Sequence, residues 1–282
     1  MFFYELINYA YSTMLEVRSS SDWFLTSGRQ GASGSQMLRS PHVRKSAPKP
    51  RLPEGIRIYA ISDVHGCSDL LRTMFEIIDR DLMTIGPRRA IHVFLGDYID
   101  RGPDSSGTID LLIDRARRHE SIFLKGNHEE FLFEVLKYPE TLQSWRQYGG
   151  LQTLSSYGVQ PPLNPTVEER KELIDQLAMA IPMHHRIFFQ MLRTSFTCGD
   201  FFFVHAGIKP GIPLASQAEE DLLWIRDEFL LSEKKHEKYI VHGHTPVRQP
   251  DIRPNRANID TGAYATGNLT LLTIQGDRLL AL

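Results

Sequence analysis

The sequence predicts an α/β protein in which two mixed β-sheets pack face to face and helices flank them. Three observations support this prediction. Short apolar runs of β type alternate with helix-type stretches in the first half of the body, which favours parallel strands joined by helices. Closely spaced strand-type runs dominate the last third, which indicates a second sheet that is antiparallel or mixed. With 282 residues, 41% of them hydrophobic and 23% charged, the chain can bury a full core without disulfides.

Three apolar runs in the first half predict buried strands, at residues 57–62, 90–95 and 121–124. A polar loop containing glycine follows each run, and then a stretch with helical spacing, over residues 70–82, from 105 onward and over 129–136. Ligands bind at the carboxyl ends of the strands in open α/β sheets. We therefore expect the three loops to converge on one site.

The region 138–193 is predicted to be mostly helical, with helices over residues 142–154 and 173–181. We expect either a cap-like insertion or helices that pack on one face of the sheet, and we place no catalytic residue there. The later strand-type runs lie at 195–198, 201–205, 239–242, 257–259, 269–274 and 278–280. Gly199-Asp200 and Gly276-Asp277 are hairpin signals between two pairs of these runs.

Residues 1–53 are predicted to form a flexible, partly basic tail, and residues 54–282 one folded domain. We hypothesise that Met37 is the functional start of the chain. Residues 1–57 carry eight Lys/Arg against four Asp/Glu, which leaves 24 of the 32 basic and 30 of the 34 acidic residues for the remainder. An acidic body argues against a nucleic-acid partner and suits a cation-binding site.

The cysteine and hydropathy patterns bear on the compartment. Cys67 and Cys198 give no disulfide framework, so we expect two reduced thiols in a cytoplasmic protein. No apolar run approaches the roughly 20 residues that span a bilayer, and no membrane partner is predicted. The oligomeric state stays open.

Five short motifs each follow a β-type apolar run. They are Asp63-Val64-His65-Gly66, Gly96-Asp97-Tyr98-Ile99-Asp100-Arg101-Gly102, Gly126-Asn127-His128-Glu129, His205-Ala206-Gly207 and Gly243-His244-Thr245. One fragment alone is a weak signal, but the ordered set has a low risk of a chance match. Six residues of the set offer carboxylate, amide or imidazole ligands without a thiolate: Asp63, His65, Asp97, Asn127, His205 and His244. Divalent cations of the hard or borderline class take this mix, so we predict two such ions bridged by Asp97.

A centre of two divalent ions suits phosphoester hydrolysis, because it activates water and stabilises charge during in-line attack. His128 directly follows Asn127 and can lie at the site without binding metal. Asp100 can hold one imidazole nitrogen of His128 while the other donates a proton to the leaving alkoxide. Arg101 and Arg226 are candidate phosphate ligands, since a guanidinium matches phosphate oxygens bidentately.

The other histidines are interpreted as structural or surface residues. His92 lies inside a predicted strand, and His184 and His185 begin a helical stretch. His242 lies two residues before His244, and we favour His244 as the ligand because it falls in the loop after the strand.

With these motifs the chain resembles the phosphoprotein phosphatase family of metal-dependent serine/threonine phosphatases, in particular its bacterial and phage members. The likeness runs from about Ile56 to Leu282 and covers all the signature blocks in family order. The resemblance implies the calcineurin-like metallophosphoesterase fold and a dinuclear Mn²⁺-type centre, with Fe or Zn as alternatives. It also implies that metal-activated water attacks the phosphate and that no phosphoenzyme forms.

The resemblance also assigns a role to each motif residue. Asp63, His65 and Asp97 would hold the first metal, and Asp97, Asn127, His205 and His244 the second. His128 would be the general acid paired with Asp100, and Arg101 and Arg226 would bind phosphate. One departure is Ser62, which stands where the family often has glycine.

The main functional prediction is a serine/threonine or dual-specificity protein phosphatase that acts on a phosphorylated protein or peptide. The alternative is a symmetrical diadenosine tetraphosphatase, whose family shares the metal motifs. Its members typically lack the Asp-Arg-Gly pairing and have Asp after Asn-His, so Asp100-Arg101-Gly102 and Glu129 favour the protein phosphatase branch. An inactive phosphate-binding module is a remote alternative, because no predicted ligand is missing.

Overall fold

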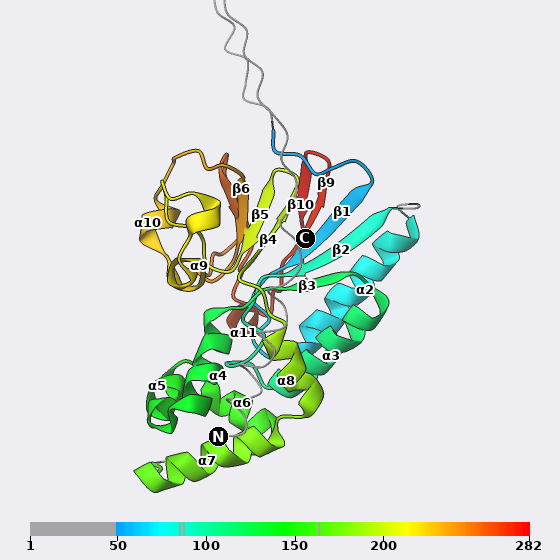
Figure 1. The fold of residues 1–282 in the computed structure, drawn as a ribbon. Helices are drawn as coiled ribbons and strands as arrows, with labels where there is room; N and C mark the ends of the chain where they lie inside the picture. Colours follow the sequence, from blue (N-terminus) through cyan, green and yellow to red (C-terminus); the bar gives the residue numbers. More distant parts are fainter. Residues whose placement is uncertain (1–48, 85, 87, 163) are drawn as a thin grey trace, which may run out of the picture. The chain divides into compact units, whose positions relative to one another are not determined.

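A computed structural model describes residues 49–84, 86, 88–162 and 164–282, and the predictions about residues 1–48, Met37 included, lie outside it. Two five-stranded sheets pack face to face, and helices cover their outer faces (Figure 1). The strand orders are β10-β9-β1-β2-β3 and β4-β5-β6-β8-β7. The predicted α/β fold with two mixed sheets is therefore confirmed.

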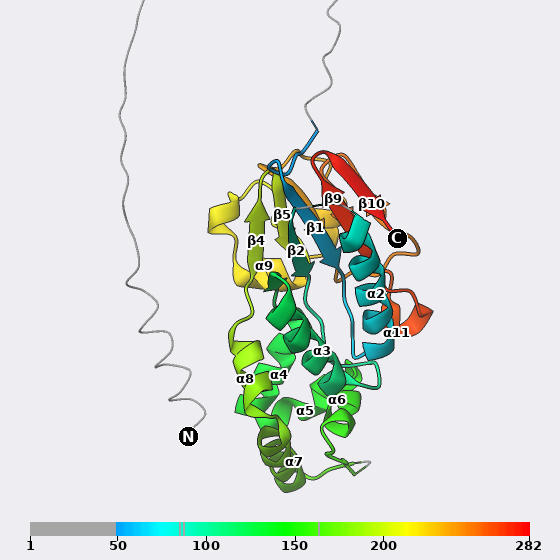
Figure 2. The same cartoon turned by 90° about the vertical axis from the view of Figure 1, so that its right-hand side faces the viewer.

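The first sheet is built on three parallel strands and a hairpin. Its strands are β1 (Ile56–Ile61), β2 (Arg89–Phe94), β3 (Ser121–Phe123), β9 (Leu271–Gln275) and β10 (Arg278–Ala281). Helices α2 (Ser68–Thr84) and α3 (Ser105–Arg118) cover its outer face (Figures 1 and 2). On β1, Tyr59 and Ile61 pack in the cluster with these helices, whereas Ile58 and Ala60 pack against the second sheet. Burial on both faces explains the continuous apolar runs of these strands.

The second sheet contains β4 (Ser195–Cys198), β5 (Phe201–Val204), β6 (Tyr239–His242), β7 (Asp251–Ile252) and β8 (Arg256–Asn258). Phe201 and Phe203 face the first sheet. Phe202 and Val204 pack in a separate cluster with residues of α9 (Glu219–Trp224) and α10 (Asp227–Leu230). The strand pattern did not predict the short elements β7, α9, α10, η2 (Leu214–Ser216) and α11 (Ala263–Thr266).

The last two strands differ from the prediction, because they belong to the first sheet and not to the second. β9 pairs antiparallel with β1, and β10 pairs with β9. Both predicted hairpins are present, and their glycines, Gly199 and Gly276, have φ of 56° and 57°. Glycine adopts these left-handed values freely. A hairpin signal gives no information about which sheet edge the hairpin joins, which is why the sheet assignment was wrong.

The helical region lies beyond the carboxyl ends of β1–β3 (Figures 1 and 2). It contains η1 (Pro139–Thr141), α5 (Leu142–Gln147), α6 (Gly150–Ser156), α7 (Val167–Ala180) and α8 (Met183–Gln190). The predicted single helix over 142–154 is two helices, because Gly149 has a φ of 99° that interrupts the helix. The helix predicted over 129–136 is α4 (Asn127–Lys137), which places Asn127 and His128 in its first turn.

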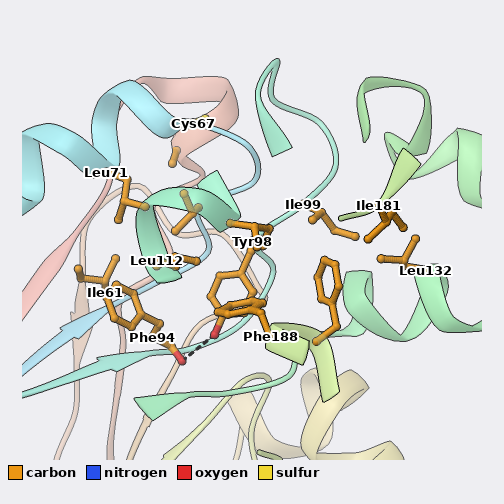
Figure 3. Close-up of a cluster of buried hydrophobic side chains, with 14 of the residues drawn as sticks. Ile61, Cys67, Leu71, Phe94, Tyr98, Ile99, Leu112, Leu132, Ile181 and Phe188 are labelled. Atoms are coloured by element: carbon orange, nitrogen blue, oxygen red, sulfur yellow. Dashed lines mark hydrogen bonds between the residues drawn. The ribbon is translucent and has the colours of Figure 1, made fainter. Parts of the chain in front are cut away.

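A hydrophobic cluster joins the first sheet to this helical region (Figure 3). The Tyr98 ring packs edge-on against Phe188, with 5.5 Å between centroids. Its hydroxyl lies 2.7 Å from the Leu124 carbonyl and 3.2 Å from the Phe94 carbonyl. Because Tyr98 follows Asp97 directly, this packing anchors the loop after β2 to the core.

The folded body begins before residue 54. Leu52 is 2% exposed and packs between the sheets, and its N–H donates to the Gly276 carbonyl at 2.9 Å. Within the described ranges, no helix is both long and apolar enough to cross a membrane.

Candidate metal centre

The loops that follow β1, β2, β3, β5 and β6 bring their polar side chains together, as the strand order predicts. Two groups have ligand atoms that all lie within 4.8 Å of one another: His65, Asp97 and His128 form one, and Asp97, His205 and His244 form the other. Each of these five residues is buried. Asp97 is the member that the two groups share.

The two carboxylate oxygens of Asp97 face different imidazoles. Oδ2 lies 3.5 Å from His65 Nε2, and Oδ1 lies 3.5 Å from His205 Nε2. Asp97 is therefore placed to contact a cation on either side, which fits the predicted bridging role.

Hydrogen bonds orient two of the imidazoles. Nδ1 of His65 and Nδ1 of His205 lie 2.9 Å from the Ile99 and Leu95 carbonyls. Since a carbonyl only accepts, each Nδ1 carries the proton and each Nε2 presents a lone pair. The lone pair of His205 then faces Asn127 Oδ1 at 2.9 Å. His205 Nε2 and Asn127 Oδ1 are then two acceptors with no proton between them, an arrangement that a bound cation would stabilise.

His244 completes the second group. Its Nδ1 lies 2.9 Å from Asn127 Oδ1 and 3.1 Å from His205 Nε2. Burial lowers the pKa of His244 and of His65, which favours the neutral imidazole that ligates metals. Burial also raises the pKa of Asp97 well above its usual value, and the Glu129 charge adds to this effect. A bound cation would oppose that shift, so the donor set fits divalent metal.

Asp63 belongs to neither group. Its carboxylate accepts the His244 N–H at 3.1 Å and the Ser62 hydroxyl at 2.8 Å. Burial raises the pKa of Asp63, as does the nearby charge of Asp260, a buried residue that the motifs did not single out. The structure thus places Asp63 beside the second group, through the backbone of His244.

Two motif glycines are explained by the close approach of these carboxylates. A Cβ at Gly126 would overlap Asp97 Oδ1, and a Cβ at Gly243 would overlap Asp63 Oδ1. Only glycine allows each loop to approach so closely. Glycine is therefore needed at these two motif positions because loops that are distant in sequence touch there.

His128 and Asp100 form the predicted pair. His128 Nδ1 lies 2.7 Å from Asp100 Oδ2. Asp100 also accepts the Trp145 indole N–H at 2.8 Å and the Thr153 hydroxyl at 2.5 Å. Burial raises the pKa of Asp100 to about 7, while these hydrogen bonds act in the opposite direction. The helical region, in which no catalytic residue was predicted, thus supplies two residues that position Asp100.

Arg101 fixes the tautomer of His128. The guanidinium only donates, and its Nη2 lies 3.1 Å from His128 Nε2, so Nε2 accepts and Nδ1 carries the proton toward Asp100. Burial lowers the pKa of His128, and the Arg101 charge lowers it further. To donate a proton from Nε2, His128 must therefore first lose this contact with Arg101 and gain a proton at Nε2.

The two predicted phosphate ligands occupy different environments. Arg101 is half-buried and packs over the Tyr264 ring of α11, 4.7 Å from its centroid. Arg226 is exposed and donates to Thr245 Oγ1 at 3.2 Å. Arg101 therefore contacts the His128 pair directly, whereas Arg226 lies at the rim beside the His244 loop.

Backbone strain is concentrated at this site. Among the residues that the structure describes, the non-glycine residues with positive φ all belong to the predicted set: His65, Asp97, Asp100, Arg101 and His244. Such conformations occur preferentially at functional sites, where the surrounding structure holds them in place.

Glu129 is a site residue that the sequence pattern did not identify as functional. It is fully buried, and its carboxylate accepts the N–H groups of Asp97 at 3.0 Å, Tyr98 at 2.8 Å and Gly126 at 2.9 Å. It thereby fixes the loop that carries Asp97 to the start of α4. An acidic residue in the third position of a helix is a capping signal that sequence can show.

Two other histidines lie outside both groups. His92 accepts from Arg115 Nε at 3.2 Å, and burial lowers its pKa to about 3. His242 packs edge-on against Phe229, with 5.0 Å between centroids. Both placements agree with the structural interpretation of these residues.

Comparison with known proteins identifies the family. Residues 56–273 match the calcineurin-like phosphoesterase family, and the chain belongs to it. Over 233 residues, 75% of this chain and 88% of the relative, the sequence is 27% identical to the asymmetrical bis(5′-nucleosyl)-tetraphosphatase PrpE of Anoxybacillus flavithermus.

Solved structures show the same fold. A crystal structure of a candidate diadenosine tetraphosphatase has a TM-score of 0.54 and 20% identity, covering 83% of this chain and 97% of that chain. A cold-active protein tyrosine phosphatase has a TM-score of 0.52 and 18% identity, covering 82% and 78%. The PrpE relatives are named as tetraphosphatases, so serine/threonine specificity, the finer part of the sequence prediction, is not confirmed.

Proposed function

We propose that this chain hydrolyses bis(5′-nucleosyl) tetraphosphates with two divalent cations, Mn²⁺ by preference. The observation that carries the hydrolytic part is Asp97, whose oxygens face His65 and His205 at 3.5 Å each. The substrate class rests on the name of the PrpE relatives. That name specifies asymmetrical cleavage, so we propose the asymmetrical reaction in place of the symmetrical alternative.

In this proposal each part of the site has one task. His65 and Asp97 would hold one cation, and Asp97, Asn127, His205 and His244 the other, with Asp63 at the edge of the set. Cations bound there supply charge neutralisation on the phosphate and activation of a water molecule. Arg101 binds a phosphate oxygen, and on doing so releases Nε2 of His128.

Once free of Arg101, Nε2 of His128 takes up a proton from solvent while Asp100 holds the Nδ1 proton. The imidazolium then donates the Nε2 proton to the leaving group and returns to its neutral form. The importance of this proton depends on the leaving group. An alkoxide, released from phosphoserine, is a strong base and needs the proton. A nucleotide phosphate, released from the polyphosphate, is stable as an anion and needs it less.

A groove beside the centre favours a second candidate, a protein phosphatase. The groove has a volume of about 470 Å³ and is lined by Trp224 and the glutamates Glu130, Glu134, Glu219 and Glu220. The Trp224 ring lies 6.2 Å from the His244 ring. Lys125 pairs with Glu219 at 2.6 Å, which leaves the lining negative. Such a surface attracts a basic phosphopeptide and repels a tetraphosphate chain.

The test is a side-by-side assay of the Mn²⁺-loaded protein on diadenosine tetraphosphate and on a basic phosphoserine peptide. We expect the higher kcat/KM with the tetraphosphate, and mono- and triphosphate products in equal amounts. Two diphosphates would indicate symmetrical cleavage. A higher kcat/KM with the peptide would contradict the proposal and support the second candidate.

The groove provides a matched variant for this assay. Glu220→Gln removes one groove charge and leaves the ligands unchanged. It should raise kcat/KM for the tetraphosphate by a few-fold at low salt and lower it for the basic peptide, because exposed charges act mainly through steering.

A further inference from the structure

A third cluster of potential ligands lies away from the catalytic centre, at the junction of α3 and α8. It consists of Asp110 on α3 and the consecutive residues His184 and His185 in the first turn of α8. Their ligand atoms all lie within 4.8 Å of one another. The sequence pattern assigned the two histidines a structural or surface role, and the proposed function does not use them.

Both imidazoles converge on one carboxylate oxygen. Asp110 Oδ1 lies 3.1 Å from His184 Nε2 and 3.0 Å from His185 Nε2. The two rings are nearly perpendicular, at 79°, with 4.4 Å between centroids. For comparison, the ligand atoms of a tetrahedral zinc site lie roughly 3.3–3.5 Å apart, given bonds of about 2.0–2.2 Å. Small movements of the side chains would therefore create a coordination site.

A further contact orients His185. Its side chain is fully buried, and its Nδ1 lies 2.8 Å from the Tyr157 hydroxyl. When the Nε2 of a histidine binds metal, Nδ1 carries the proton and usually donates it to an oxygen. Tyr157 is placed to accept that proton and to fix the ring with Nε2 toward Asp110.

The cluster is also open to solvent on one side. The side chains of Asp110 and His184 are 60% and 49% exposed. An ion can therefore enter, and water can complete its coordination, as in sites with three protein ligands.

We propose that Asp110, His184 and His185 bind one borderline divalent cation, such as Zn²⁺, separate from the two ions of the catalytic centre. Two imidazoles and one carboxylate select Zn²⁺, Co²⁺, Ni²⁺ or Cu²⁺ over Mg²⁺ and Mn²⁺, which prefer oxygen ligands. The ion joins α3 to α8 and so stabilises the helical region against the first sheet. Without the ion, Nε2 of His184 and Nε2 of His185 are each within hydrogen-bonding distance of Asp110 Oδ1.

The test compares the full-length protein with variants by equilibrium dialysis against Zn²⁺, followed by elemental analysis. Asp110→Asn and His184→Ala alter exposed side chains and should fold. Each is expected to hold one equivalent of Zn²⁺ less than the wild type, whatever the catalytic centre holds. The matched control is Asp114→Asn, which removes an exposed carboxylate on α3 that pairs with Arg118 and should leave the stoichiometry unchanged.

Two further measurements sharpen the result. Tyr157→Phe should keep the stoichiometry but weaken Zn²⁺ binding at this site by on the order of 10–100-fold. Zn²⁺ should raise the Tm of the wild type more than that of His184→Ala. Equal Zn²⁺ content in the wild type and in both cluster variants would overturn the proposal. This outcome would leave the proposed function untouched, because none of these residues belongs to the catalytic centre.

Discussion

The loops at the ends of the two sheets contribute different chemistry to the centre. Those of the first sheet carry Asp97, Asp100 and His128, and buried side chains fix them from several directions, Glu129 and Trp145 among them. Those of the second sheet contribute the buried imidazoles of His205 and His244, and the carbonyl of Leu95, which follows β2, orients His205. The bridging carboxylate and the proton-transferring pair thus lie on the first sheet, together with the neutral ligands His65 and Asn127. The second sheet adds two further neutral ligands.

This division predicts which changes affect the whole centre and which affect one part of it. A change at Asp97 or in the His128–Asp100 pair of the first-sheet loops should disturb both ions or the chemical step. A change in a second-sheet loop should disturb one ion or substrate binding alone.

The largest effect is expected from Asp97→Asn. Because Asp97 faces both groups, its loss should release both ions and lower kcat/KM by at least about 10³-fold, since metal ions contribute several kcal/mol to transition-state stabilisation. The second-sheet counterpart, His244→Ala, should retain about one ion. Elemental analysis of both variants checks this, and two ions retained in Asp97→Asn would refute the bridging role.

His128→Asn is expected to have the next largest effect. The ions should stay bound, and kcat for a phosphoserine peptide should fall by on the order of 10²–10⁴. The decrease for diadenosine tetraphosphate should be smaller, because its leaving group is a phosphate. Loss of metal would instead identify His128 as a ligand, which is a real alternative because Nε2 lies 3.9 Å from Asp97 Oδ2.

The smallest effects compare the two arginines. Arg101→Ala should lower kcat/KM by roughly 10–100-fold, as expected for a partly buried hydrogen bond between charged groups. Arg226→Ala should cost less than about fivefold, because exposed ion pairs contribute little. Metal content should be unchanged in both. Equal losses would show that the rim arginine binds phosphate as strongly as the half-buried one.

Much of the fold could be predicted because strand and helix periodicities are local. The runs over 57–62 and 90–95 became β1 and β2 with ends shifted by one residue. The sheet that the 269–280 hairpin joins could not be predicted, because pairing partners are decided by tertiary packing. Similarly, the interruption at Gly149 depends on one backbone angle within an otherwise helical pattern.

The site was predictable to a similar degree. Ligand types in ordered motifs indicated which side chains would meet, and His65, Asp97, His205 and His244 do meet. Residues that only position another site residue do not stand out in the sequence in this way. Trp145 and Thr153 hold Asp100 from 45 and 53 residues away, and a tryptophan in a helical stretch is ordinarily a core residue.

The strained backbone of the site has a consequence for the evolution of this chain. A non-glycine residue in the left-handed region costs about 1 kcal/mol or more, so the strained residues His65, Asp97, Asp100, Arg101 and His244 together cost on the order of 5 kcal/mol, close to the entire net stability of a marginal domain. Selection for thermal stability alone would therefore favour glycine at these positions and erase the chemistry. The non-glycine side chains at these positions therefore lower the stability of the fold in exchange for the groups that the reaction needs.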